Sequence, residues 1–116
     1  MPWHIRIKSN RRDYLKYKES ARALVINRLA YFNQEYKTTF NRISIRNQRT
    51  RWGSCTSKRN LNFNYKIALI LPRLADYIIV HELCHLLEMN HSQKFWDQVA
   101  RTMPDHVVLR RELNGK

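Results

Sequence analysis

The sequence predicts an α+β domain in which a small sheet containing a β-hairpin packs on one buried helix. Two observations carry this prediction. Short segments of period-two alternation stand among longer segments with apolar residues at helical spacing. One of the helical segments is apolar nearly all round, which is typical of a buried helix. With 116 residues, 43% of them hydrophobic, we expect one domain over 1–116, with further helices on its N-terminal and C-terminal sides.

The first predicted elements are a strand, a long helix and a second strand. Residues 3–8 alternate apolar and polar side chains and predict a short strand. Residues 13–37 place apolar and aromatic side chains on one stripe, so we expect a helix there, capped by residues 11–13. Residues 41–46 alternate again and predict the second strand.

The next segment, 52–65, predicts a β-hairpin. Residues 52–56 form a short extended piece, and the polar residues 57–60 suit a turn. Residues 61–65 then alternate three apolar side chains with two asparagines. Gly53 is one of only two glycines in the chain, and it indicates a bulge or a close backbone approach in the first strand.

The apolar helix is expected over 73–89, with Pro72 in its first turn. Two histidines and a glutamate stand among its apolar residues: His81, Glu82 and His85. Buried polar groups are normally hydrogen-bonded or bound to a metal ion. These three residues therefore indicate a site and not a solvated helix face.

The spacing of these residues, H-E-x-x-H, is typical of a metal site. Two histidines four residues apart point to the same side of a helix, and the glutamate beside them suits the general base for a metal-bound water. His91 follows six residues after His85. A straight helix would carry it about 9 Å further along the axis, so the chain must turn, and we expect the turn at residues 89–90.

Two further helices are predicted after the motif. Residues 93–102 follow Ser92, a favourable N-cap residue, and place aromatic side chains towards the core. The segment Met103-Pro104 breaks this helix. Asp105 is then expected to cap a last helix over 106–113.

The net charge of +13 is unevenly distributed. Residues 1–66 hold 16 Lys and Arg against three acids, whereas residues 67–116 hold six of each. One interpretation of such a basic half is contact with DNA or another polyanion. The other is that the charge only keeps a small protein soluble. The candidate nucleic-acid contacts are Arg11, Arg12, Arg46, Arg49, Arg51, Lys58 and Arg59.

The N-terminus has no apolar signal-peptide region, and no run of eighteen apolar residues exists to span a membrane. We therefore expect a cytoplasmic protein without a membrane partner. The sequence does not define the oligomeric state, and we favour a monomer. In a reducing cytoplasm Cys55 and Cys84 are expected to be free thiols.

The chain resembles the YgjP-like zinc metallopeptidases, and more distantly the WLM and SprT-like (Spartan) proteases. The resemblance covers about residues 13–113. It rests on Arg51-Trp52-Gly53-Ser54-Cys55, Asn64, Leu71-Pro72, His81-Glu82-Leu83-Cys84-His85 and Asn90-His91-Ser92-Gln93-Lys94-Phe95-Trp96. It implies one Zn²⁺ ion bound by His81, His85 and His91, a catalytic Glu82, and a zincin-like fold with an edge strand at the rim of the cleft. The more distant relatives act on proteins bound or crosslinked to DNA.

The identity of the third ligand is open to alternatives. The histidine spacing equals that of the metzincins, but Glu88 stands where they have a glycine, so we reject that assignment. A gluzincin-like site would use a downstream glutamate, and only Glu88 and Glu112 are available. We favour His91.

The sequence thus predicts a zinc-dependent endopeptidase in which Glu82 activates a metal-bound water, with nucleic-acid-associated proteins as a substrate class. The alternative is a non-catalytic or latent zinc domain that binds nucleic acid through its basic half. An extended peptide is expected to add to an edge strand, 52–56 or 61–65. Candidate substrate-binding residues are Trp52, Gly53, Ser54, Cys55 and Asn64.

Several other residues are candidates for supporting roles. Cys55 is also a candidate for masking the metal in a latent form. Candidates for stabilising the oxyanion are His106, Tyr77 and Arg51. Candidates for orienting the imidazoles are Asp97, Asp76 and Asn64.

Overall fold

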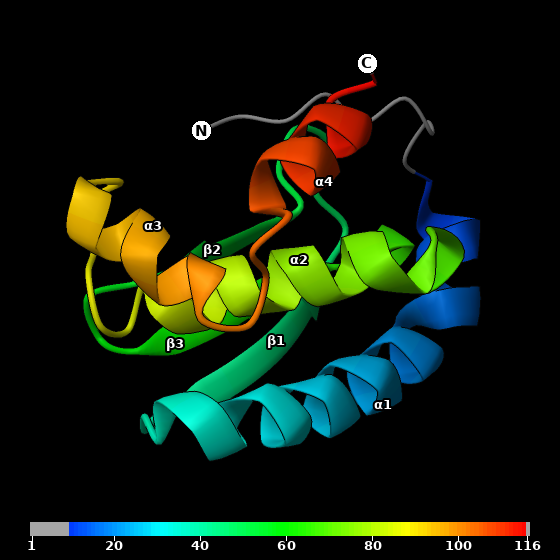
Figure 1. The fold of residues 1–116 in the computed structure, drawn as a ribbon. Helices are drawn as coiled ribbons and strands as arrows, with labels where there is room; N and C mark the ends of the chain where they lie inside the picture. The colour runs from blue at the N-terminus through cyan, green and yellow to red at the C-terminus, as the bar shows by residue number, and fades with distance from the viewer. Residues whose placement is uncertain (1–9, 116) are drawn as a thin grey trace.

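The computed structural model describes residues 10–115 and confirms an α+β domain with a small sheet among helices. Its elements in chain order are α1 (Arg11–Tyr36), β1 (Arg42–Arg46), β2 (Gly53–Cys55), β3 (Asn60–Asn64), the 3-10 helix η1 (Tyr65–Leu69), α2 (Pro72–Cys84), α3 (Gln93–Ala100) and α4 (His106–Leu113). Helix α2 crosses the middle of the molecule, with α1 on one side and α4 on the other (Figure 1). The strand predicted for 3–8 lies outside the described residues.

Helix α1 begins two residues earlier than predicted. Its N-cap is Asn10, whose side-chain oxygen accepts a hydrogen bond from the backbone N–H of Asp13 at 2.8 Å. The cap predicted at 11–13 is therefore wrong, because a short polar side chain one residue upstream satisfies the open backbone donors. The helix ends at Lys37, which adopts the left-handed conformation with φ of 54°. The predicted apolar stripe is buried: Ala21, Val25, Leu29, Phe32 and Tyr36.

The sheet has the strand order β1-β3-β2. Strands β2 and β3 pair in antiparallel fashion, with Ser54 opposite Asn62, which confirms the predicted hairpin. Strand β1 pairs with β3 in parallel, with Ser44 opposite Asn62. Strand β3 is therefore central, and the expectation that 61–65 forms an edge strand is wrong. The sequence pattern misled because alternation reports which face is buried and not which neighbours a strand has.

Helix α2 starts at Pro72, as predicted, but ends at Cys84, five residues before the predicted end at 89. Beyond Cys84 the backbone bonds tighten: the N–H of Leu86 donates to Leu83 and that of Leu87 to Cys84. The apolar residues that extended the helical pattern, Leu87 and Met89, are instead 39% and 51% exposed in this turn. The chain therefore changes direction earlier than the predicted turn at 89–90.

The C-terminal helices lie close to their predicted positions. Ser92 caps α3, its hydroxyl accepting a hydrogen bond from the backbone N–H of Phe95 at 3.4 Å, as predicted. Asp105 stands at the N-cap position of α4, but its side chain makes no capping hydrogen bond, so that expectation is wrong. Within residues 10–115 no helix combines the length and the apolar character that a membrane crossing requires.

Candidate metal centre

Helix α2 places His81 and His85 on one face at its C-terminal end. Their ring centroids are 4.9 Å apart, as expected for side chains separated by one helical turn. Both residues are buried, with 4% and 8% of their surface exposed. The helix around them is apolar and packs against α1, β2, α3 and α4. Imidazoles buried in such surroundings are expected to be hydrogen-bonded or bound to a metal ion.

The early turn after α2 brings His91 back over the same face. Its Nε2 atom lies 3.1 Å from Nε2 of His85 and 3.2 Å from Nε2 of His81. One nitrogen from each of the three residues lies within 4.8 Å of the others. Bonds of about 2.05 Å to a tetrahedral zinc ion place two ligand nitrogens about 3.3 Å apart, so the cluster has the dimensions of a three-histidine site.

The opposite ring nitrogens hold the imidazoles in the required orientation. His85 Nδ1 lies 3.1 Å from the backbone carbonyl oxygen of Glu88, and His81 Nδ1 lies 3.3 Å from Glu82 Oε2. Since both acceptors are oxygens, each Nδ1 carries the proton and each Nε2 presents a lone pair to the cluster. Asp76 and Asp97, the predicted orienting residues, pair instead with Arg28 and Gln93.

Two aromatic side chains of α3 support the three imidazoles from one side. The Phe95 ring stacks on His85 at 4.4 Å and meets His81 and His91 edge-on at 5.1 and 5.0 Å. The Trp96 ring stacks on His91 at 5.8 Å. The sequence indicated both aromatics only as core residues. Their positions, four and five residues after His91, are the sequence signal that indicates this contact.

Glu82 is enclosed between this cluster and strand β2. Only 3% of its surface is exposed. A methyl group at Gly53 would lie 3.0 Å from Glu82 Cγ, 3.1 Å from its Oε2 and 3.0 Å from the backbone oxygen of Asn62. Gly53 is therefore required for space, as the predicted close approach implied, and it brings the backbone of β2 against the carboxylate.

Replacing Gly53 by alanine is expected to displace the Glu82 carboxylate by a few tenths of an ångström and to lower kcat about tenfold. Catalytic geometry is sensitive on this scale, because misplacement by 1 Å costs about a hundredfold. Zinc content should not change, since the methyl group meets no imidazole among its closest contacts. Kinetics of the peptide hydrolysis that the resemblance implies, together with metal analysis, test this, and Ser57→Ala in the exposed turn is the control. An unchanged kcat would contradict the prediction.

Two histidines of the cluster have a lowered pKa, which favours their uncharged form. Burial, followed by the neighbouring His81 and His85, lowers the pKa of His91 from 6.5 to about 4. Burial likewise lowers the pKa of His85. His91 is an exposed residue overall, but its Nε2 edge faces the other imidazoles. Neutral imidazoles are the form that binds metal, so the cluster is ready for an ion at neutral pH.

The metal-free protein should consequently lose stability as the pH falls from about 6.5 to about 4. In this window the histidines of the unfolded chain are protonated, whereas His91 of the folded protein is not. The unfolded state therefore binds more protons, and acid favours it. Urea unfolding of chelator-treated protein across this range measures the effect. His91→Gln should flatten the curve, and an equal slope in both proteins would refute this assignment.

The predicted substrate-binding residues divide into two groups. Gly53, Ser54 and Cys55 form the short strand β2 beside Glu82, and all three are partly exposed. Trp52 is only 5% exposed and belongs to the core. Asn64 is fully buried, and its amide donates to the backbone oxygens of Gln48 and Arg51. Asn64 thus fixes the connection before β2 and is out of reach of a substrate.

Both cysteines are free, as predicted. Cys84 is buried on the helix between the two histidines and takes no part in the cluster. Burial and the charge of nearby Glu82 raise the pKa of Cys55 to about 11. Cys55 is therefore a protonated thiol in the metal-free protein. Because a coordinated thiol loses its proton to the metal, masking of the metal by Cys55 stays a prediction.

The predicted basic residues are mostly exposed, but they belong to different parts of the chain. Arg59 differs from the others: it has φ of 67°, and its guanidinium donates to the backbone oxygens of Thr39 at 2.8 Å and Leu86 at 3.4 Å. Arg59 therefore ties the hairpin turn to the loop that carries His91. The exposed members are Arg11, Arg12, Arg46, Arg49, Arg51 and Lys58.

The three candidates for stabilising the oxyanion lie in different surroundings. Tyr77 is fully buried beside His81, with ring centroids 5.9 Å apart, and Arg51 is exposed. His106 stacks on Trp96 at 5.2 Å. None of the three belongs to the histidine cluster.

Glu88 and Glu112, the alternative third ligands, are placed differently from His91. Glu88 contacts His85 through its backbone oxygen, and the Glu112 carboxylate pairs with Arg73 at 2.6 Å.

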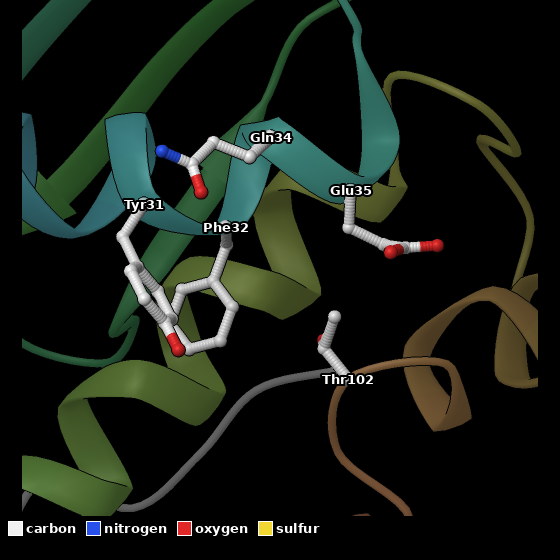
Figure 2. Close-up of a pocket in the computed structure, with 5 residues that line it drawn as sticks. All are labelled: Tyr31, Phe32, Gln34, Glu35 and Thr102. Atoms are coloured by element: carbon white, nitrogen blue, oxygen red, sulfur yellow. The ribbon is translucent and has the colours of Figure 1, made fainter.

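A hollow of about 380 Å³ between the end of α1 and Thr102 involves none of the site residues (Figure 2).

Comparison with known proteins places these features in context. The family described as YgjP-like, metallopeptidase domain, matches residues 8–116. No curated protein matches the chain. The crystal structure of the metallopeptidase zymogen of Pyrococcus abyssi abylysin is similar over 77% of this chain and 87% of that chain, with a TM-score of 0.65 and 19% identity. The zymogen of Methanocaldococcus jannaschii jannalysin is similar over 79% and 91%, with a TM-score of 0.57 and 22% identity. At these identities the likeness shows a shared fold.

Proposed function

The chain belongs to the YgjP-like metallopeptidase family, and from this premise we propose that it is a zinc-dependent endopeptidase with a zincin-like active site. Membership implies a metal, typically zinc, and a peptide or protein substrate. His81, His85 and His91 would hold one Zn²⁺ ion through their Nε2 atoms. Three neutral ligands leave a fourth position open, which is the arrangement of a catalytic and not a structural zinc site.

The observation that carries this proposal is the convergence of three imidazole nitrogens beside one enclosed carboxylate. Held by these three residues, a zinc ion would supply a water of lowered pKa, towards about 7, and a Lewis acid for the substrate carbonyl. Glu82 then accepts the proton of the attacking water and delivers it to the departing amine nitrogen. Gly53 and the Nδ1 atom of His81 keep the Glu82 carboxylate in place for both transfers.

The substrate would lie along β2. Among the described residues β2 has a single strand neighbour, β3, so its other edge is available to an extended peptide. The backbone groups of Ser54 and Cys55 would bind the peptide main chain. Since Gly53 contacts Glu82, a peptide on this edge would pass close to the proposed general base.

Metal removal and replacement test the function. The purified protein, loaded with one equivalent of zinc, is expected to cleave members of a peptide library. A chelator should abolish cleavage, and one equivalent of zinc should restore it. Protein that holds zinc yet cleaves no peptide, in the presence or absence of DNA, would overturn the proposal in favour of a non-catalytic or latent zinc domain.

The exposed basic residues support DNA or another polyanion as a partner, and proteins bound to it as substrates. Neutralising phosphates with basic side chains makes affinity fall steeply with salt, by about 0.9 logarithmic units per contact for each tenfold increase. Titration of a DNA duplex at several salt concentrations tests this. The double variant Arg49→Gln/Arg51→Gln should flatten the dependence, whereas Arg111→Gln on α4 should not. Absence of binding at low salt would exclude the polyanion role.

A further inference from the structure

A second concave region lies between α3 and α4, next to the metal centre. Its volume is about 380 Å³, which is within the range of small-ligand pockets. The apolar part of its wall comes from Trp96 and Ala100 of α3 and from Val107 of α4. Val107 is 55% exposed, so an apolar side chain stands open to solvent at this place.

The Trp96 ring belongs both to this pocket and to the metal centre. It stacks on His91 at 5.8 Å and meets His81 at 6.0 Å. It also stacks on His106 at 5.2 Å and lies 5.3 Å from the guanidinium of Arg110, both of which line the pocket. An occupant of the pocket that touches Trp96 is therefore separated from the histidine cluster by one indole ring.

The polar groups of the pocket favour an uncharged occupant. Arg110 is balanced by one acid, Asp97, which accepts a hydrogen bond from the Gln93 amide at 2.8 Å. Burial lowers the pKa of His106, so its imidazole is neutral at pH 7. The four polar residues of the lining carry no net charge together, so they do not select an acidic or basic side chain. The wall of Trp96, Ala100 and Val107 then favours an apolar one.

We propose that this pocket, bounded by Trp96, Ala100 and Val107, receives a bulky apolar side chain of the substrate, aromatic or long aliphatic. The inference rests on the proposed peptidase function and specifies its substrate class. The His106 and His91 rings lie 5.2 and 5.8 Å from the Trp96 ring between them. An extended peptide advances about 3.3 Å per residue, so the selected residue lies within about three positions of the cleaved bond. Trp96 thereby links occupation of the pocket to the ligand His91.

Filling the pocket is the direct test. Zinc-loaded wild-type protein should cleave peptides with Phe or Leu at one such position about 10- to 100-fold better, in kcat/KM, than the alanine counterparts. Ala100→Phe should reduce this preference to less than about threefold by lowering kcat/KM for the Phe and Leu peptides. Ala23→Phe on the exposed side of α1 is the matched control and should keep the preference. Zinc content and circular dichroism verify that each variant is folded.

Two outcomes separate this inference from the proposed function. If no peptide is cleaved, the peptidase proposal fails, and the pocket is tested by NMR on the zinc-loaded protein. N-acetyl-phenylalaninamide should then shift the Trp96 indole N–H signal, N-acetyl-glycinamide should not, and Ala100→Phe should abolish the shift. If peptides are cleaved without a bulky apolar preference, or if Ala100→Phe leaves that preference intact, the pocket is not a substrate subsite.

Discussion

Replacing Glu82 by glutamine is expected to reduce peptide hydrolysis about a thousandfold without releasing zinc. General-base catalysis contributes about 10²–10⁴-fold, and an amide cannot accept the proton of the attacking water. The side chain keeps its size, so the close packing against Gly53 is preserved. Its amide oxygen can still accept the His81 Nδ1 proton, so the imidazole keeps its orientation. Steady-state kinetics on a cleaved peptide and metal analysis of the same samples measure both parts.

Glu88 provides the matched control for this variant. It lies six residues further along, in the turn that carries His91, and contacts His85 through its backbone oxygen, not its carboxylate. Glu88→Gln should therefore retain both activity and zinc. Equal loss of activity in the two variants would point to a general electrostatic effect. Full activity in Glu82→Gln would remove Glu82 from the mechanism.

The main elements of the fold follow from local patterns in the sequence. The α1 stripe, the hairpin and the start of α2 at Pro72 are set by hydrophobic spacing and by turn residues, which act over a few positions. The parallel pairing of β1 with β3 joins strands between which β2 stands in the sequence, and it could not be predicted this way. Strand order depends on which surfaces remain to be covered after the helices pack, and local alternation contains no such information.

For the site, too, the features set by local geometry can be predicted from the sequence, and the features set by contacts between elements cannot. H-E-x-x-H spacing on a helix determines where His81 and His85 point, because helical geometry is fixed. Enclosure of Glu82 by Gly53 was indicated only as a close approach, since its partner lies on another element. The contacts of Phe95 and Trp96 with the imidazoles depend on the angle between α2 and α3, which the turn after Cys84 sets. That turn was placed too late because Leu87 and Met89 continue the apolar pattern although they are exposed.

Removing His91 is expected to abolish tight zinc binding. The Nε2 atoms of His81 and His85 would remain as two ligands on one helix face, without the third nitrogen that closes the site at 3.1 and 3.2 Å. Loss of an outer hydrogen-bonding partner typically weakens metal affinity 10–100-fold, and loss of a direct ligand should exceed that range. Competition with a chromophoric chelator, and metal analysis after dialysis of His91→Ala, measure the change.

The control and the alternatives for the third ligand can be tested together. His106→Ala removes another imidazole that contacts Trp96 but lies outside the cluster, so it should retain zinc. If His91→Ala also retained zinc, the third ligand would have to be Glu88 or Glu112. Glu112 would first have to leave its ion pair with Arg73. The double variants His91→Ala/Glu88→Gln and His91→Ala/Glu112→Gln would then show which carboxylate had replaced the imidazole. Because His91 comes from a turn and not from α2, its loss should leave the helix content unchanged, so loss of zinc with an unaltered far-ultraviolet spectrum would identify it as a ligand.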